Sequence, residues 1–199
     1  MTTRPVGLSR DLAINRAMRA QVDGIDCVVW RNSKGALAAW NNRCPHRGMR
    51  LSHGFVRGDR LACLYHGWQY DSAGHCRHMP AHPDLDPPET IKAEVYSVAE
   101  VNGVLWVSTS GPAEAQTDTS CHIPLRSLTI AAAVASIKAK MARQATEKGL
   151  IALYNPIAPH ETLVTVLASA DTSLDQLRAH SRWCDAVRRD ILFKTEQAA

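Results

Sequence analysis

Two closely spaced Cys/His pairs, in the segments NRCPHRGMRLSHG and LACLYHGWQYD, constrain this sequence more than any other feature. The first pair is Cys44 and His46, the second is Cys63 and His66, and sixteen residues separate the two pairs. Thiolates and imidazoles are preferred ligands of soft and borderline transition metals. The two pairs therefore predict a metal site that is built from two separate segments of the chain.

The remaining cysteines do not suggest a disulfide framework. The chain has six cysteines in 199 residues, and its N-terminus lacks the apolar core of a signal peptide. No apolar stretch approaches the roughly 20 residues that a membrane span needs. We therefore expect a cytoplasmic protein without a membrane segment, in a reducing compartment where clustered Cys and His bind metal. The cysteines expected only to pack are Cys27, Cys76, Cys121 and Cys184.

The net charge of the chain is +4, which is too mild to predict nucleic-acid binding. Five arginines nevertheless lie in or beside the Cys/His segments. They are Arg43, Arg47, Arg50, Arg57 and Arg60. Two interpretations stay open: a solvated loop face, or a positive rim that steers an acidic redox partner.

Residues 1–110 are expected to form one mainly β domain. The segment IDCVVWR is rich in β-branched residues and is followed by the turn-like NSKG and a second strand, ALAAWN. Further short strands are expected in RLACLYH, GWQYD, IKAEVYSVAEV and GVLWVS. This pattern favours a small antiparallel β barrel or sandwich.

Residues 111–120 are expected to be a linker, because TSGPAEAQTDTS is rich in small and polar residues. Residues 121–199 then predict a small α+β domain of the order β-α-β-β-α. Its last helix begins with a capping box, Ser173 with Gln176. The apolar face expected on this helix consists of Leu174, Leu177, Cys184, Val187 and Ile191.

The spacing within each Cys/His pair discriminates between two kinds of metal site. A Cys₂His₂ zinc site is possible in principle, but the single residue between Cys44 and His46 is tight for two ligands of one tetrahedral ion. The difficulty disappears when the two residues of each pair serve different irons. A [2Fe–2S] centre in which one iron takes two thiolates and the other takes two imidazoles has this property.

The paired motif CPHRG and CLYHGW resembles the Rieske domain of bacterial ring-hydroxylating oxygenases and oxidative demethylases. Within this family, the chain is most similar to the extra N-terminal Rieske domain of reductases that serve methylxanthine-type N-demethylases. The resemblance implies a mainly β domain with two cluster-binding loops. It also implies a Rieske-type [2Fe–2S] cluster with Cys44 and Cys63 on one iron, and His46 and His66 on the outer iron.

The resemblance further implies that neighbouring residues support the cluster: Arg47, Gly48, Tyr65, Gly67 and Trp68. Respiratory Rieske proteins carry an additional cysteine in each loop, where this chain has Met49 and Tyr65, and a serine where it has Trp68. Because fewer groups hydrogen-bond to the sulfurs, we expect the low-potential oxygenase type.

A Rieske oxygenase subunit would continue into a large domain with a mononuclear iron held by two histidines and a carboxylate. Beyond residue 110 the chain has only His122, His160 and His180, without a closely spaced pair. The sequence also lacks a flavin or nicotinamide fingerprint. We therefore expect no catalytic site, no mononuclear iron, no flavin and no NAD site in this chain.

The sequence thus predicts an electron-transfer module that accepts electrons from a flavin/ferredoxin reductase and passes them to an oxygenase. The donor could lie on the same longer polypeptide. Two alternatives stay open: a truncated oxygenase subunit that needs another chain for its mononuclear iron, and a redox-sensing regulatory protein.

Overall fold

The computed structural model describes residues 3–197, and the chain divides into two compact units. The first unit contains Ser9–Ala99 and Val107–Glu114. The second contains Arg4–Leu8, Glu100–Trp106 and the chain from Ala115 onward. The outer ends of the two predicted domains, residues 1–2 and 198–199, lie outside the described residues. Within the described part, no helix is long and apolar enough to cross a membrane.

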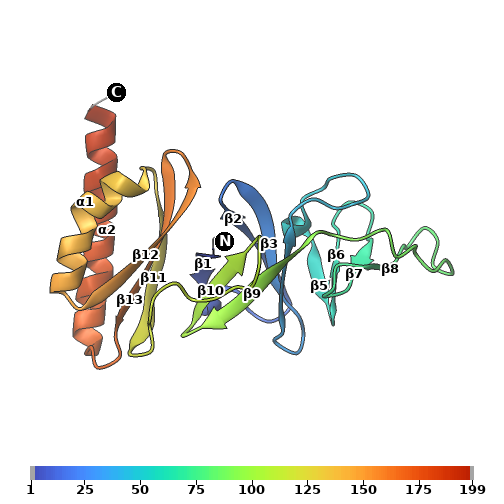
Figure 1. The fold of residues 1–199 in the computed structure, drawn as a ribbon, viewed down its shortest axis with the longest axis horizontal. Helices are drawn as coiled ribbons and strands as arrows, with labels where there is room; N and C mark the ends of the chain where they lie inside the picture. The colour runs from blue at the N-terminus through green and yellow to red at the C-terminus, as the bar shows by residue number, and fades with distance from the viewer. Residues whose placement is uncertain (1–2, 198–199) are drawn as a thin grey trace. The chain divides into compact units, whose positions relative to one another are not determined.

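One six-stranded sheet has the order β1-β10-β9-β4-β3-β2. Its strands are β1 (Thr3–Leu8), β2 (Arg16–Val22), β3 (Ile25–Arg31), β4 (Leu37–Asn41), β9 (Val95–Val101) and β10 (Val104–Ser108). β2, β3 and β4 form an antiparallel meander in which Ala17 pairs with Trp30 and Trp30 with Ala38. The strands expected in IDCVVWR and ALAAWN are therefore present and paired (Figure 1).

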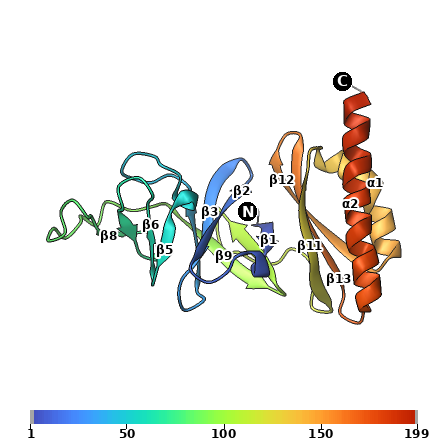
Figure 2. The same cartoon turned by 180° about the vertical axis from the view of Figure 1, so that it is seen from behind.

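A four-stranded sheet with the order β5-β6-β7-β8 belongs to the first unit. Its strands are β5 (Phe55–Arg57), β6 (Arg60–Ala62), β7 (Gln69–Tyr70) and β8 (Cys76–His78). Between β4 and β5, a short 3-10 helix spans Leu51–His53. Figure 2 shows this region from the opposite side. Three fully buried rings join the core of the unit, since Trp40 lies 5.1 Å from Trp30 and 6.3 Å from Tyr70, both in edge contact.

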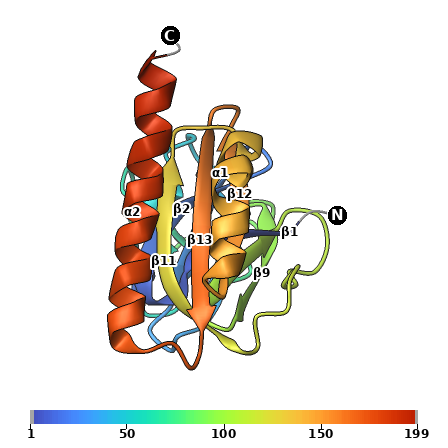
Figure 3. The ribbon, with the colours of Figure 1, turned by 90° about the vertical axis from the view of Figure 1, so that its left-hand side faces the viewer.

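The second unit contains a three-stranded antiparallel sheet with the order β11-β13-β12. Its elements are β11 (His122–Ile130), α1 (Val134–Glu147), β12 (Leu150–Ala158), β13 (Glu161–Ser169) and α2 (Leu174–Gln197). Both helices lie on the same face of this sheet (Figure 3). The core between them includes Ile130, Met141, Val166 and Cys184, which are all fully buried. The element order is β-α-β-β-α.

The capping box at the start of α2 is formed as the sequence predicts. The backbone N–H of Ser173 donates to Oε1 of Gln176 at 3.0 Å, and the backbone N–H of Gln176 donates to Oγ of Ser173 at 3.4 Å. One part of the expected helix face is wrong. Leu174 is 63% exposed, because it is the first helical residue and lies beyond the edge of the core that buries Cys184 and Ile191.

Sequence analysis did not predict β1 or β2. The segment of β2, RAMRAQV, places Arg16 and Arg19 in a strand, and only Ala20 and Val22 of its seven residues are buried. Its alternation of apolar and polar residues is therefore weak. Pairing with β3 supplies the order that local propensity does not.

Candidate metal centre

Two loops carry the predicted ligands, and their backbones follow the same hydrogen-bond pattern. In the loop after β4, the N–H of Cys44 donates to the carbonyl of Met49 and the N–H of Gly48 donates to the carbonyl of Cys44. In the loop between β6 and β7, the N–H of Cys63 donates to Trp68 and the N–H of Gly67 donates to Cys63 in the same way. Each cysteine therefore opens a tight turn that closes at a glycine four residues later.

The two glycines satisfy a backbone requirement of these turns. Gly48 has a φ of +72° and Gly67 a φ of +71°, which lie in the left-handed region that side chains with a Cβ rarely adopt. A Cβ at Gly67 would also approach Cγ of Pro80 to 3.0 Å, whereas a Cβ at Gly48 would meet nothing within 4 Å. A side chain is therefore harder to accommodate at position 67 than at position 48.

The two thiols lie inside the first unit. Cys44 is 3% exposed and Cys63 is 2% exposed, and both belong to the same apolar core as Trp40 and Leu61. The hydroxyl of Tyr70, on β7, lies 3.1 Å from Sγ of Cys44. Burial raises the pKa of Cys63, and so does the adjacent Cys44 thiol. Hydrogen bonds from the backbone N–H groups of Tyr65 and His66 lower the pKa of Cys63, but by less.

The two imidazoles lie together and are partly exposed. The ring centroids of His46 and His66 are 4.6 Å apart in an edge contact. Trp68 of the second loop stacks on His46 of the first, with centroids 4.1 Å apart and an interplanar angle of 4°. Tyr65 lies against His66 at 3.8 Å. Desolvation, followed by electrostatic interactions with His66 and Arg47, lowers the pKa of His46, which favours a neutral imidazole.

The four predicted ligands are arranged as a buried pair of thiols and a partly exposed pair of imidazoles. In the described part of the chain, no group of three or more His, Cys, Asp or Glu side chains is placed to hold one ion. A structural zinc site normally takes four protein ligands on one ion. Two thiols and two imidazoles are also the ligand types of a centre whose two metal ions each take two protein ligands.

Comparison with known protein families assigns most of the first unit. Residues 2–92 match the Rieske [2Fe-2S] domain. These residues form a Rieske domain. The match contains both loops and all four predicted ligands, and the mainly β fold expected for residues 1–110 is confirmed.

Two curated relatives come from Pseudomonas putida. The oxidoreductase NdmD is 38% identical over 109 residues, which are 54% of this chain and 18% of NdmD. The methylxanthine N1-demethylase NdmA is 44% identical over 69 residues, which are 35% of this chain and 20% of NdmA. The matched segments thus cover about a fifth of each relative. The expected resemblance to components of oxygenase and demethylase systems is confirmed.

The solved structure of Pseudomonas putida CBB5 NdmA has a similar fold, with a TM-score of 0.73 at 18% sequence identity. The likeness covers 93% of this chain and 77% of that chain. It therefore extends well beyond the residues that match the Rieske domain and into the second unit. At this identity the comparison concerns the fold alone.

The residues of the Rieske domain fit the cofactor that its family implies. The donor set is two thiols and two imidazoles, as a Rieske [2Fe–2S] cluster requires. The buried position of the thiols and the N–H groups directed at Cys63 suit sulfur ligands that carry negative charge. The Rieske domain thus supports a [2Fe–2S] cluster.

Tyr70 contacts Cys44 and was not singled out by sequence analysis. It lies 26 residues from Cys44 in the chain, and only the pairing of β7 with β6 turns its ring toward the first loop. A tyrosine in a short strand more often packs than donates to a ligand, so no spacing rule indicated this contact.

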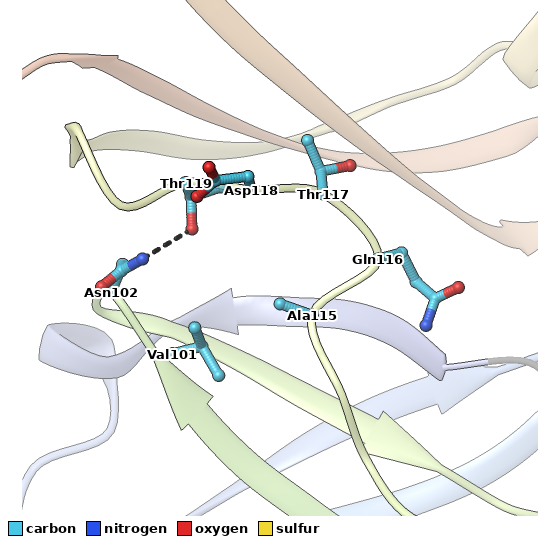
Figure 4. Close-up of a pocket in the computed structure, with 7 residues that line it drawn as sticks. All are labelled: Val101, Asn102, Ala115, Gln116, Thr117, Asp118 and Thr119. Carbon is cyan, nitrogen blue, oxygen red and sulfur yellow. Dashed lines mark hydrogen bonds between the residues drawn. The ribbon is translucent and has the colours of Figure 1, made fainter.

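A separate hollow of about 370 Å³ lies in the second unit (Figure 4). The turn at Asn102 and the segment Ala115–Thr119 line it. The side-chain amide of Asn102 donates to Oγ1 of Thr119 at 3.0 Å across this hollow. Its single ionisable lining residue, Asp118, is exposed to solvent, so the hollow offers no buried charge to a ligand.

Proposed function

We propose that this chain is an electron-transfer module that relays electrons from a flavin/ferredoxin reductase to a Rieske non-haem iron oxygenase. The acceptor would be an N- or O-demethylase or a ring hydroxylase. The observation that carries the proposal is the contact of the partly exposed His46 with the partly exposed His66, each within three residues of a buried cysteine. The thiols are thus shielded from solvent, while a partner protein can reach the imidazoles.

The ligands in this proposal are Cys44 and Cys63 for one iron, and His46 and His66 for the other. When bound, the [2Fe–2S] cluster supplies one-electron transfer at a potential that its neutral imidazole ligands raise above that of a plant-type ferredoxin. The protein's own contribution is to exclude water from the thiols, to orient the imidazoles through Trp68 and Tyr65, and to donate hydrogen bonds to sulfur. The neighbouring residues Arg47, Gly48 and Gly67 shape the two turns.

The test is electron paramagnetic resonance of the dithionite-reduced protein, with iron, sulfide and zinc counted in the same sample. We expect a rhombic signal with the low average g-value of mixed Cys/His ligation, and two irons per chain. A silent sample with one zinc per chain would instead identify a zinc-stabilised binding module. Electron transfer is then tested by mixing the reduced protein with an oxidised demethylase component and following the decay of the reduced signal.

A second candidate function rests on the extent of the structural likeness. Because the fold of NdmA is matched over 93% of this chain, the second unit has a counterpart in the fold of a protein named as a methylxanthine N1-demethylase. The chain would then be an oxygenase-derived subunit that needs another chain for its mononuclear iron. Substrate turnover that appears only when Fe(II) and a complementing chain are added together, with a third iron bound in the resulting complex, would favour this candidate over the carrier.

A further inference from the structure

The net positive charge of the chain lies in the helical layer of the second unit. The whole chain has 23 basic and 19 acidic side chains, and residues 134–148 and 174–192 hold eight of the basic and four of the acidic ones. The rest of the chain therefore carries 15 of each kind, and its formal charge is zero. Because α1 and α2 lie on the same face of the sheet, this charge belongs to one layer of the second unit (Figure 3).

Side chains of α1 and α2 join the two helices into one continuous surface. The indole N–H of Trp183 on α2 donates to Oε1 of Gln144 on α1 at 3.0 Å. Lys148, directly after α1, lies over the ring of Trp183 at 5.8 Å, and Lys140 forms an ion pair with Asp190. A partner that approaches this layer therefore contacts both helices.

α2 presents a row of arginines on the side that faces away from the sheet. Arg178, Arg182 and Arg189 are four and seven residues apart, so they share one side of the helix, and all three are exposed. Arg182 and Arg189 are each two residues from a buried core residue, Cys184 and Ile191 respectively. Two residues of a helix are about 200° apart around its axis, so the arginines lie nearly opposite the core.

Two of these arginines are not neutralised within the protein. The three aspartates of α2 have other partners: Asp175 pairs with Arg178, Asp185 with Arg126 and Asp190 with Lys140. In the part of the chain that the structure describes, Arg182 and Arg189 form no ion pair. Both cations are therefore available to carboxylates of another molecule.

α1 presents small side chains on its own outer side. Ala135, Ala139 and Ala142 are exposed and lie four and three residues apart, whereas Ile137 and Met141, on the opposite side, are fully buried. The distance between two packed helices depends on the size of the side chains at their contact. A partner helix can therefore approach the backbone of α1 closely.

We propose that this surface binds a carboxylate-bearing helix of a partner protein. The helix surface consists of Arg178, Arg182 and Arg189 on α2 and Ala135, Ala139 and Ala142 on α1. Carboxylates on the partner pair with the arginines, while its backbone lies against the alanines. The inference goes beyond the proposed electron-transfer function, because it concerns the second unit and needs no redox group.

The composition of the helix surface favours a protein over a bilayer or a nucleic acid. A helix that binds a bilayer surface inserts large apolar residues, and the outer side of α2 presents arginines instead. A net charge of +4 is also too mild for nucleic-acid binding. Arginines four and seven residues apart match carboxylates at the same spacing on another helix.

The test uses the full chain and a fluorescent, alanine-rich helical peptide whose glutamates lie four and seven residues apart on one side. The matched peptide has glutamine at the same positions. Anisotropy measures binding over a series of salt concentrations. We expect the glutamate peptide to bind at low salt about tenfold or more tightly than the glutamine peptide, with an affinity that falls as salt rises.

The informative variant is Arg182→Glu with Arg189→Glu, and the matched control is Lys34→Glu with Arg57→Glu. Each reverses two exposed cations and changes the net charge equally, but the control residues lie in the first unit. We expect the first variant to bind the glutamate peptide about tenfold or more weakly, and the control to stay within about twofold. Ala139→Gln with Ala142→Gln should weaken binding about threefold or more, because longer side chains hold the partner helix away from α1.

Circular dichroism establishes that each variant retains its helices, and Arg182→Gln with Arg189→Gln is the substitute if the charge reversal does not. Equal affinity for the two peptides, or an equal loss in variant and control, would overturn the proposal. So would tighter binding of a DNA duplex or of phosphatidylserine vesicles that the same variant abolishes, since the surface would then recognise phosphate. None of these measurements needs the cluster, so their failure leaves the proposed electron-transfer function untouched.

Discussion

The hydroxyl oxygen of Tyr70 lies 3.1 Å from Sγ of Cys44, across the interface between β7 and the first ligand loop. Burial in the core, followed by the contact with Cys44, raises the pKa of Tyr70 well above its ordinary value. The phenol therefore stays protonated and donates to a sulfur that carries negative charge when it binds iron. A hydrogen bond of this kind stabilises the reduced centre, which has more negative charge on its sulfurs.

Replacing Tyr70 with Phe should therefore lower the reduction potential of the centre. The expected change is tens of millivolts, because about 1.4 kcal/mol of differential stabilisation corresponds to about 59 mV for one electron. Potentiometric titration monitored by circular dichroism measures it. Tyr96→Phe is the control, since the hydroxyl of Tyr96 bonds to Asn41 and not to a ligand. An equal potential in Tyr70→Phe and the unaltered protein would contradict this role of the phenol.

Replacing His46 with Cys should lower the reduction potential further than Tyr70→Phe does, because an anionic ligand replaces a neutral one. The same titration measures the shift, and iron analysis establishes that two irons remain. His53→Cys is the matched control, since His53 is exposed on the short helix after the first loop. If the cluster assembles in His46→Cys with an unchanged potential, His46 is not a ligand.

Adding a methyl group at the glycine of each ligand loop should destabilise the two loops unequally. Gly48→Ala adds only the cost of a left-handed backbone, about 1 kcal/mol, whereas Gly67→Ala adds the same cost and a close contact with Pro80. We therefore expect Gly67→Ala to lose the cluster at lower urea concentrations than Gly48→Ala. Visible absorbance during urea titration records the loss. Equal sensitivity of the two variants would show that Pro80 moves away without cost.

Asp26 should make the first unit sensitive to acid. Burial raises the pKa of Asp26, but hydrogen bonds from Arg19 and Asn42, the charge of Arg19, and a hydrogen bond from Arg50 together hold it below the ordinary value of 3.8. Because the pKa of Asp26 is lower in the folded state, its ionised carboxylate contributes to the free energy of unfolding above pH 3.8. This contribution is lost as the pH falls further. Asp26→Asn should reduce the free energy of unfolding by about 1 kcal/mol at pH 7, and this difference should shrink progressively as the pH falls below 3.8.

Urea unfolding at several pH values measures this difference. Asp59→Asn is the control, because Asp59 is 74% exposed and lies 3.8 Å from Arg60. A difference between Asp26→Asn and the unaltered protein that stays constant from pH 7 to pH 3 would rule out the proposed linkage.

The capping box of α2 should stabilise the second unit. Ser173→Ala removes the acceptor for the N–H of Gln176 and should cost about 1 kcal/mol in the free energy of unfolding. Ser136→Ala, at an exposed position inside α1, is the matched control and should be neutral or slightly stabilising, since alanine favours the helix interior. Urea unfolding followed by circular dichroism distinguishes the two.

Local spacing was enough to predict the two ligand loops, because each Cys/His pattern lies within four consecutive residues. Few other kinds of site use the combination of Cys44-x-His46 with Cys63-x-x-His66. The strand over Ile25–Arg31 and the capping box at Ser173 were predicted for the same reason, since β-branched residues and a Ser/Gln pair act within a few residues of the chain. The α+β character of the second unit also followed from local periodicity.

Only the tertiary structure decided which side chains meet. The stacking of Trp68 on His46 and the contact of Tyr70 with Cys44 both join residues from different loops or strands, and strand pairing brings them together. The same holds for β1 and β2, whose own residues favour a strand weakly and whose order comes from their neighbours in the sheet. The sequence by itself predicted the kind of metal centre, because the two Cys/His motifs that resemble those of Rieske domains each lie within a few consecutive residues. The partners that tune and expose the centre were decided by long-range packing, which no local pattern encodes.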